Sequence, residues 1–154
     1  MTSRQQIDDF LAQKRFAFVG VSREPKDFSR ALFREFRSRG YQPVPVHPEV
    51  DEIEGQRCYP ALTDIQPPVD SVLLMTSPSV TRALANSGAF EGIKRVWMHR
   101  GGGAGAVDPE AVSLCTNRGI SVIPGECPFM FLPGAMWFHR MHGFIRRITG
   151  KYPS

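Results

Sequence analysis

The chain has 154 residues, of which 42% are hydrophobic and 22% charged, and its formal net charge is +4 at pH 7. This length predicts a single domain, residues 1–154, and the composition excludes a disordered or fibrous chain. Its charge-poor stretches are too short to span a membrane and no secretory signal is visible, so a cytoplasmic protein is expected.

The N-terminal third of the chain predicts a helix, a strand, a helix and a strand. Within residues 1–14, capping-box spacing between Ser3 and Gln6 predicts a helix over residues 3–14. Residues 16–20 predict a short buried strand, and a stripe of apolar residues from Phe28 predicts a helix that stops at Gly40. Residues 41–46 predict a second strand, which must lie near a sheet edge or pair irregularly because it contains two prolines.

The rest of the chain continues this alternation. Residues 69–75 predict the most apolar strand, followed by a helix capped by Ser77 that runs to about residue 87. Further strands are expected over residues 95–98 and 120–123, with a helix between them. Alternating strands and helices predict an α/β protein with a three-layer Rossmann-like fold and a mainly parallel five-stranded sheet. Residues 135–149 predict a C-terminal amphipathic helix with a basic face.

The loops that follow the strands are the candidate binding residues, because open α/β sheets bind ligands beyond the carboxyl ends of their strands. The loop after the first strand combines a flexible turn, a hydroxyl and positive charge suited to phosphate, in Gly20, Val21, Ser22, Arg23, Lys26 and Arg30. The loop after the third strand, Thr76-Ser77-Pro78, is expected to face the same crevice. Cys127 follows the last strand and is expected within reach of it.

Other classes of site fit the sequence less well. A dinucleotide-binding loop would have three glycines where this chain has Gly20, Ser22 and Pro25, and an acidic residue where it has His47-Pro48. A small NAD(P)-binding oxidoreductase stays open as an alternative because Glu49 is close to that position. The histidines do not have metal-site spacing and no nucleic-acid readout motif is present, so neither a metal nor a nucleic-acid partner is expected.

Four segments, in order, carry a resemblance to a known family: FVGVSR at 18–23, YQPVPVHP at 41–48, GQRCYPAL at 55–62 and VDSV at 69–72. Together they resemble the CoA-binding domain family, over residues from about 10 to 130. The chain is similar to the nucleotide-binding domain of the succinyl-CoA synthetase alpha subunit and to small stand-alone bacterial proteins. The resemblance implies that Gly20–Ser22 and Arg23 hold CoA phosphates, that His47-Pro48 borders the adenosine, and that residues 76–79 line the crevice.

The resemblance also limits the expected activity. The synthetase subunit has a second domain with a phosphorylated histidine, for which this chain has no room. The expectation is therefore binding of coenzyme A or an acyl-CoA without evident catalytic machinery. A homodimer, an acyl-CoA enzyme partner, a protein-interaction module using the C-terminal helix, and a mixed disulfide between Cys127 and the CoA thiol are further hypotheses.

Overall fold

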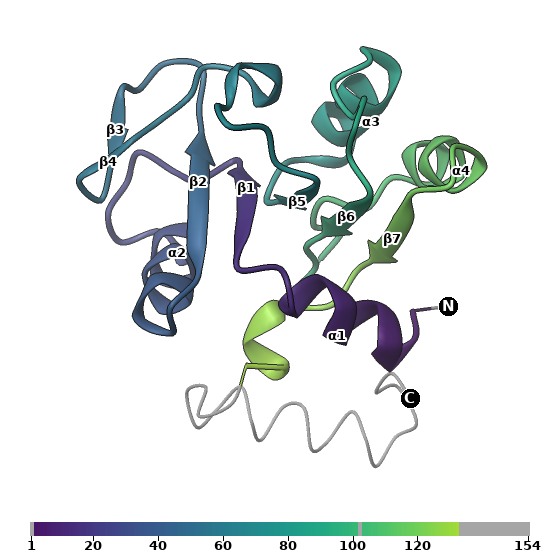
Figure 1. Ribbon diagram of the computed structural model, residues 1–154, viewed down its shortest axis with the longest axis horizontal. Helices are drawn as coiled ribbons and strands as arrows, with labels where there is room; N and C mark the ends of the chain where they lie inside the picture. The colour runs from purple at the N-terminus through teal and green to yellow at the C-terminus, as the bar shows by residue number, and fades with distance from the viewer. Residues whose placement is uncertain (1, 102, 133–154) are drawn as a thin grey trace.

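The computed structural model describes residues 2–101 and 103–132. A five-stranded parallel sheet forms its centre, with the strand order β2-β1-β5-β6-β7 (Figure 1). The strands are β1 (Arg15–Val19), β2 (Gln42–Val46), β5 (Ser71–Leu74), β6 (Arg95–Met98) and β7 (Ser121–Pro124). The predicted α/β fold with a parallel five-stranded sheet is confirmed, while the helix predicted over residues 135–149 lies outside the described residues.

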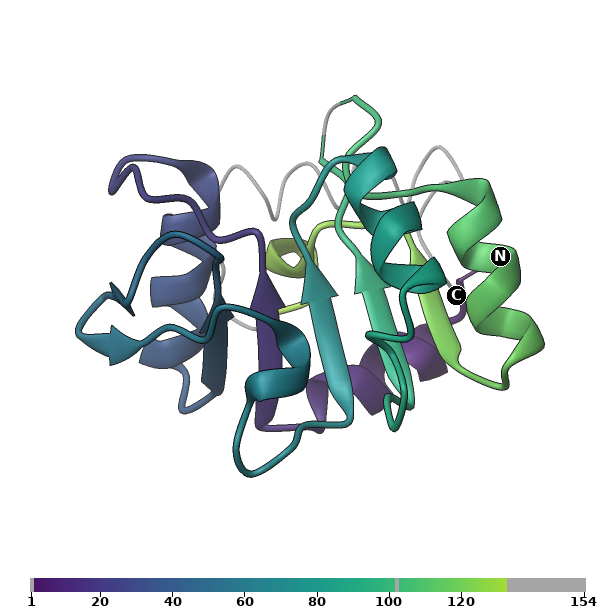
Figure 2. The ribbon, with the colours of Figure 1, turned by 90° about the horizontal axis from the view of Figure 1, so that it is seen from above.

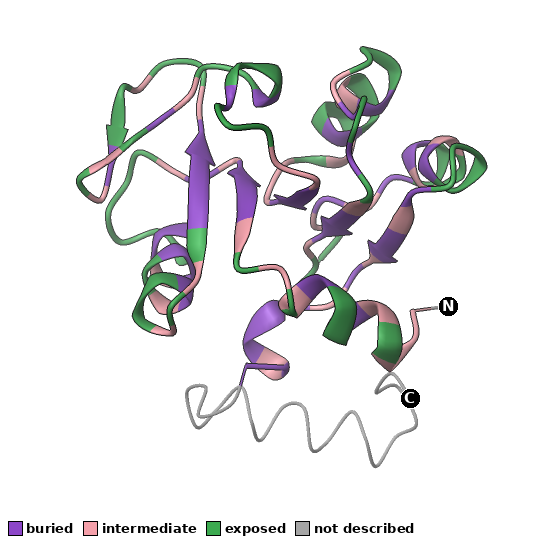
Figure 3. Cartoon of the chain, in the orientation of Figure 1, coloured by how far each residue is buried: buried purple, intermediate pink, exposed green. Residues whose placement is uncertain are grey.

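Helices cover both faces of this sheet, which gives the three layers (Figure 2). They are α1 (Arg4–Leu11), α2 (Phe28–Ser38), α3 (Pro78–Asn86) and α4 (Pro109–Asn117). Side chains alternate along the strands, so Phe16 and Phe18 are buried with α1 and α2, whereas Ala17 and Val19 are buried with α3 and α4. The strands are therefore buried on both faces (Figure 3).

The N-terminal helix is shorter than the predicted 3–14. Its capping box forms as expected, because the Ser3 side chain accepts from the Gln6 N–H and the Gln6 side chain accepts from the Ser3 N–H. The C-terminal boundary was wrong, since the Lys14 carbonyl accepts a hydrogen bond of 2.6 Å from the Gln42 N–H. Residue 14 is thus already part of the pairing between β1 and β2.

The prediction that the proline-containing strand lies at an edge is confirmed. In β2, the Gln42 N–H points toward β1, so the alternation of the backbone directs the nitrogens of Pro43 and Pro45 away from it. Their missing N–H groups therefore cost no hydrogen bond of the sheet. The outward carbonyls of Pro43 and Pro45 accept from Gln56 Nε2 and the Tyr59 N–H.

A small antiparallel pair, β3 (Glu52–Ile53) and β4 (Gln56–Arg57), lies beyond β2 and was not predicted. It is joined by a tight turn in which Glu54 and Gly55 both have positive φ, 51° and 74°. Two-residue strands are too short to leave an alternating pattern in the sequence. Among the described residues, no helix is long and apolar enough to cross a bilayer.

Candidate functional site

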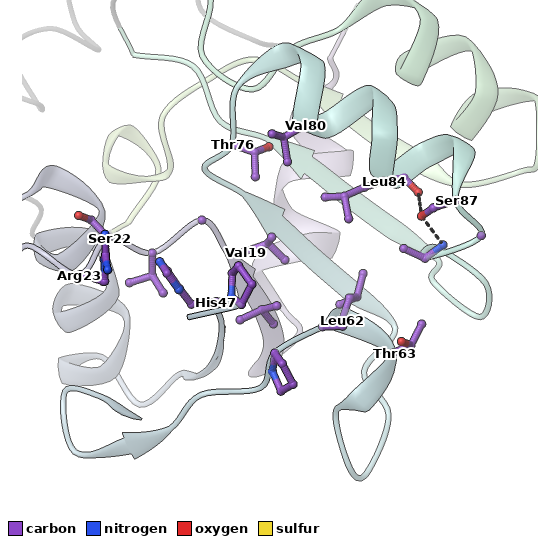
Figure 4. A pocket seen from close by; sticks show the side chains of 18 of the residues that line it. Val19, Ser22, Arg23, His47, Leu62, Thr63, Thr76, Val80, Leu84 and Ser87 are labelled. Carbon is purple, nitrogen blue, oxygen red and sulfur yellow. Dashed lines mark hydrogen bonds between the residues drawn. The ribbon is translucent and has the colours of Figure 1, made fainter. Parts of the chain in front are cut away.

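A cleft with a volume of about 1030 Å³ lies at the carboxyl ends of β1, β2 and β5 (Figure 4). The chain leaves β1 toward β2 on one side and returns past β1 to β5 on the other, so this is the switch point where ligands bind in such sheets. Of the residues predicted from the sequence, the cleft is lined by Gly20, Val21, Ser22, Arg23, His47, Pro48 and Thr76.

Gly20 brings two strand ends into direct contact at the floor of the cleft. Its φ is 90°, and a Cβ atom at this position would lie 2.6 Å from the Met75 carbonyl oxygen. Real Cβ atoms do not approach a backbone oxygen so closely, and the left-handed backbone also disfavours a side chain. Glycine is therefore required by both conformation and space.

The loop after β1 is held by its own hydrogen bonds and leaves backbone donors available. The Ser22 N–H donates to Ser29 Oγ at 2.9 Å, and Ser22 Oγ accepts from the Glu24 N–H at 3.0 Å. Among the described residues, the N–H groups of Val21 and Arg23 have no acceptor. Backbone N–H groups of a turn that have no acceptor within the protein favour the binding of an anion.

The start of α2 is capped by an acidic side chain. The Asp27 carboxylate caps this helix and accepts from the Ser29 N–H at 2.9 Å. A carboxylate in this position already satisfies the helix start and would repel a second anion. Phosphate would therefore have to bind to the loop itself, which precedes the helix.

Arg30 has a different place from the one expected of a phosphate ligand. Its side chain is buried, pairs with the Glu54 carboxylate, and donates to the carbonyls of Ser22 and Arg23 at 3.2 Å each. It does not line the cleft. Arg30 therefore braces the loop from behind, and its charge is neutralised by Glu54.

The contact with Arg30 stabilises the ionised form of Glu54. Hydrogen bonding from Arg30 lowers the pKa of Glu54 below its ordinary value of 4.5, against a smaller opposing effect of burial. Arg34 adds a second ion pair to the same carboxylate at 3.2 Å. The turn between β3 and β4 is thus tied to α2 and to the loop after β1.

His47 and Arg23 stand at the mouth of the cleft. Nδ1 of His47 accepts a hydrogen bond of 3.0 Å from the Glu49 N–H, which leaves Nε2 as the protonated nitrogen of the neutral ring. Arg23 forms an exposed ion pair of 3.3 Å with Glu49, connecting the loops after β1 and β2. The cleft mouth therefore offers two nitrogen donors, of which Arg23 is already engaged by a carboxylate.

The opposite wall of the cleft is largely apolar. Thr76 lines it and its hydroxyl lies 2.7 Å from that of the buried Thr81. Val80 and Leu84 line it from α3, and Leu62 lines it from the connection after β4. Ser77 and Pro78 do not line the cleft; Ser77 caps α3 and Pro78 is its first residue.

Several lining residues were not among the sequence-predicted ones. The additional ones are Val19, Glu24, Val46, Pro60, Ala61, Leu62, Thr63, Val80, Leu84, Ser87, Gly88 and Ala89. The spacing of Val80 and Leu84 by four residues, on a helix that starts at the sheet edge, is a signal that could have identified them. Residues 60–62 end the GQRCYPAL segment that carries the family resemblance, and this segment was a second signal in the sequence that was not used to predict lining residues.

Cys127 and Lys26 are not at the cleft. The chain turns after β7 at Gly125 and Glu126, which have φ of 120° and 73°, and this carries Cys127 to the α1 and α2 face. There it is 2% exposed, beside Trp97 and Phe129. The expectation that Cys127 lies within reach of the crevice was therefore wrong. Lys26 is exposed in the loop before α2.

Burial also affects the thiol groups of the other two cysteines. It raises the pKa of the Cys58 and Cys115 thiols above their ordinary value. Both are therefore predominantly protonated at neutral pH. The described residues contain no group of histidine, cysteine or acidic side chains arranged to hold a metal ion.

His99, at the end of β6, gives a testable pH dependence. Burial lowers its pKa from 6.5 to about 4, and within the described part of the chain its buried Nε2 has no partner. The unfolded chain thus takes up a proton near pH 6.5, whereas the folded chain does so only near pH 4. Stability is therefore expected to fall by about 2 kcal/mol as the pH drops from 7 to 4.5 because of this residue.

Urea unfolding at these two pH values, for the wild type and for His99→Gln, measures that contribution. The substituted protein should lose less stability between pH 7 and pH 4.5 than the wild type. Equal losses in the two proteins would show that His99 does not titrate differently in the folded and unfolded states.

Comparison with known proteins adds family information to this geometry. The profile of a family described as a CoA binding domain matches residues 14–133. The uncharacterized protein YneT of Bacillus subtilis is 27% identical over 126 residues, which cover 81% of this chain and 90% of that protein.

Solved structures share the fold. A hypothetical protein from Pyrococcus horikoshii has a TM-score of 0.73 at 24% identity, covering 83% of this chain and 87% of that one. The dinucleotide-forming acetyl-coenzyme A synthetase 1 of Ca. Korarchaeum cryptofilum has a TM-score of 0.60 at 23% identity. That match covers 71% of this chain and 25% of the synthetase.

Proposed function

The chain belongs to the CoA-binding domain family, and from this premise we propose that it binds coenzyme A or an acyl-CoA in the cleft between the loops after β1 and β5. One observation carries the proposal. The Gly20–Ser22 loop lies at the switch point of the sheet, beside unpaired backbone N–H groups and the His47 ring.

The two sides of the cleft suit the two parts of such a ligand. The loop after β1 and the His47 ring supply donors for phosphate oxygens, which form charge-assisted hydrogen bonds. Val80, Leu84 and Leu62 supply apolar surface for the less polar arm of the ligand. The proposal is binding alone, with no reaction assigned to the chain.

The competing function, a small NAD(P)-binding oxidoreductase, makes a different prediction. Native mass spectrometry of the protein with CoA, acetyl-CoA, NAD and NADP at equal concentrations compares the four ligands directly. Preferential retention of CoA or acetyl-CoA is expected. Retention of NAD or NADP alone would overturn the proposal and redirect the search toward a dehydrogenase or reductase.

The ion pair at the cleft mouth predicts opposite effects for its two members. Arg23 has to exchange the Glu49 carboxylate for a ligand phosphate, so Glu49→Gln should strengthen CoA binding and Arg23→Gln should weaken it. Both groups are exposed, so the changes are expected to be small, about two- to fivefold, and to shrink at high salt. Isothermal titration calorimetry at two salt concentrations measures them.

Arg34→Gln provides the matched control, since Arg34 is an exposed arginine in an ion pair outside the cleft. Its substitution should leave CoA affinity unchanged. A Glu49→Gln protein that bound CoA more weakly than the wild type would mean that Glu49 contributes to the site directly instead of competing for Arg23.

A further inference from the structure

A second hollow, of about 380 Å³, lies beside β2, the edge strand of the sheet. Three arginines from separate elements line it, Arg15 of β1, Arg37 of α2 and Arg57 of β4. No acidic residue is among its lining residues. We call this hollow the arginine groove, and it shares no lining residue with the cleft.

Within residues 2–101 and 103–132, the hydrogen bonds and the ring contact of the three guanidinium groups are all with neutral groups. Arg15 Nη1 donates to the Pro67 carbonyl at 2.7 Å, and Arg37 Nη1 donates to the Glu54 carbonyl at 2.6 Å. The Arg57 guanidinium lies over the Tyr59 ring, 4.7 Å from its centroid. Among the described residues none of the three has an ion pair, although Arg30, Arg82 and Arg95 elsewhere all pair with carboxylates.

One acidic residue is the ladder partner of Arg57. Glu52 is opposite Arg57 in the β3–β4 pair, yet the two form no ion pair. Lys14 adds a further positive charge beside the groove, because its Nζ lies 4.3 Å from the centroid of the Tyr41 ring. Like charges gathered without a counterion repel one another, so an anion would be stabilised here.

The frame of the groove is held in place by hydrogen bonds. The hydroxyl groups of Tyr41 and Tyr59 donate to the carbonyls of Leu11 and Gln66, at 2.7 and 3.3 Å. Gln56 Nε2 donates to the Pro43 carbonyl at 2.9 Å, which fastens β4 to the edge of β2. The arginines therefore project from a fixed scaffold, which reduces the ordering cost of binding.

We propose that the arginine groove binds the phosphate groups of a small phosphorylated molecule, at a site separate from the cleft. The planar fork of arginine matches phosphate oxygens and makes paired charge-assisted hydrogen bonds with them. Residues Val46 and Tyr59 pair with each other between the two sites, so the groove and the cleft lie on either side of one strand contact.

Amide NMR of the full chain, titrated at constant ionic strength, tests the site. Separate titrations use inorganic pyrophosphate and ribose 5-phosphate, which distinguishes a free diphosphate from a phosphate ester. Shifts are expected at the amides of Tyr41, Gln56 and Arg57, with and without CoA present. The double variant Arg37→Gln/Arg57→Gln should bind the better of the two probes at least about tenfold more weakly.

The control double variant Lys94→Gln/Arg118→Gln removes the same formal charge away from the groove. Its affinity for the probe should stay within about twofold of the wild type, which separates a local site from general attraction. Equal weakening of the two double variants, shifts confined to residues 20–23, or no saturation by either probe would overturn the proposal. These outcomes are independent of CoA binding in the cleft.

Discussion

Replacing Gly20 with alanine is expected to abolish detectable CoA binding and to lower the free energy of unfolding by about 2 kcal/mol or more. The new Cβ would lie 2.6 Å from the Met75 carbonyl oxygen. The alanine would also have to adopt the φ of 90° that Gly20 has, which a residue with a side chain disfavours. The ends of β1 and β5 would have to separate, which displaces both loops of the cleft. Urea unfolding and calorimetric titration with CoA measure the two effects.

Gly40→Ala is the matched control for this substitution. Gly40 has a similar φ of 86°, but a Cβ atom there would have no neighbour within 4 Å. The Gly40→Ala protein should therefore lose only the stability that the unfavourable φ costs, and it should still bind CoA. If the two variants lost equal stability and both bound CoA normally, the close contact at Gly20 would not be what shapes the cleft.

The second large effect is expected at Arg30, whose substitution by methionine should lower stability by about 2–3 kcal/mol and weaken CoA binding. Methionine leaves the Ser22 and Arg23 carbonyls without this donor and removes one partner of the Glu54 carboxylate. The loop after β1 would lose its brace. Because Arg30 does not line the cleft, the loss of binding would arise through the loop and not through a lost ligand contact.

Arg34→Met is the control that distinguishes the loss of the Arg30 hydrogen bonds to the loop from the loss of one positive charge near Glu54. Arg34 pairs with the same Glu54 carboxylate but is far more exposed, 46% against 10% for the Arg30 side chain. Its removal should cost clearly less, because exposed ion pairs contribute little. Equal losses in the two variants would contradict the bracing role.

The same ion pair predicts a pH dependence. Since the pKa of Glu54 is lowered in the folded protein, its contribution to stability is present above the ordinary pKa of 4.5 and is lost as the pH falls below it. The Arg30→Met protein should show less of this acid-side loss than the wild type.

The features of the fold that depend on local sequence were predictable. Alternating strands and helices indicated a parallel sheet, the prolines at 43 and 45 indicated an edge, and Ser77 indicated a helix start that the structure confirms. The end of α1 was not predictable, because it is set by pairing between Lys14 and Gln42. That pairing joins two segments that are distant in the sequence, and no local sequence pattern determines which of their residues pair.

The parts of the candidate site that lie directly after a strand were predictable from the sequence. The residues whose position depends on contacts with distant parts of the chain were not. The loops after β1, β2 and β5 meet at one cleft because parallel strands place their carboxyl ends together. Arg30 resembled a phosphate ligand in sequence, since its partner Glu54 is 24 residues away. Chain order predicted Cys127 close to the crevice, but two positive-φ residues before it turn the chain to the other face.

Amide NMR of the protein titrated with CoA tests the central claim most directly. The account predicts shifts at Gly20, Val21, Ser22, His47 and Thr76 that saturate together, and that are absent from the Gly20→Ala protein if it remains folded. Saturable shifts located elsewhere, with residues 20–23 unaffected, would show that CoA binds outside this cleft. The absence of any saturable shift would contradict CoA binding itself.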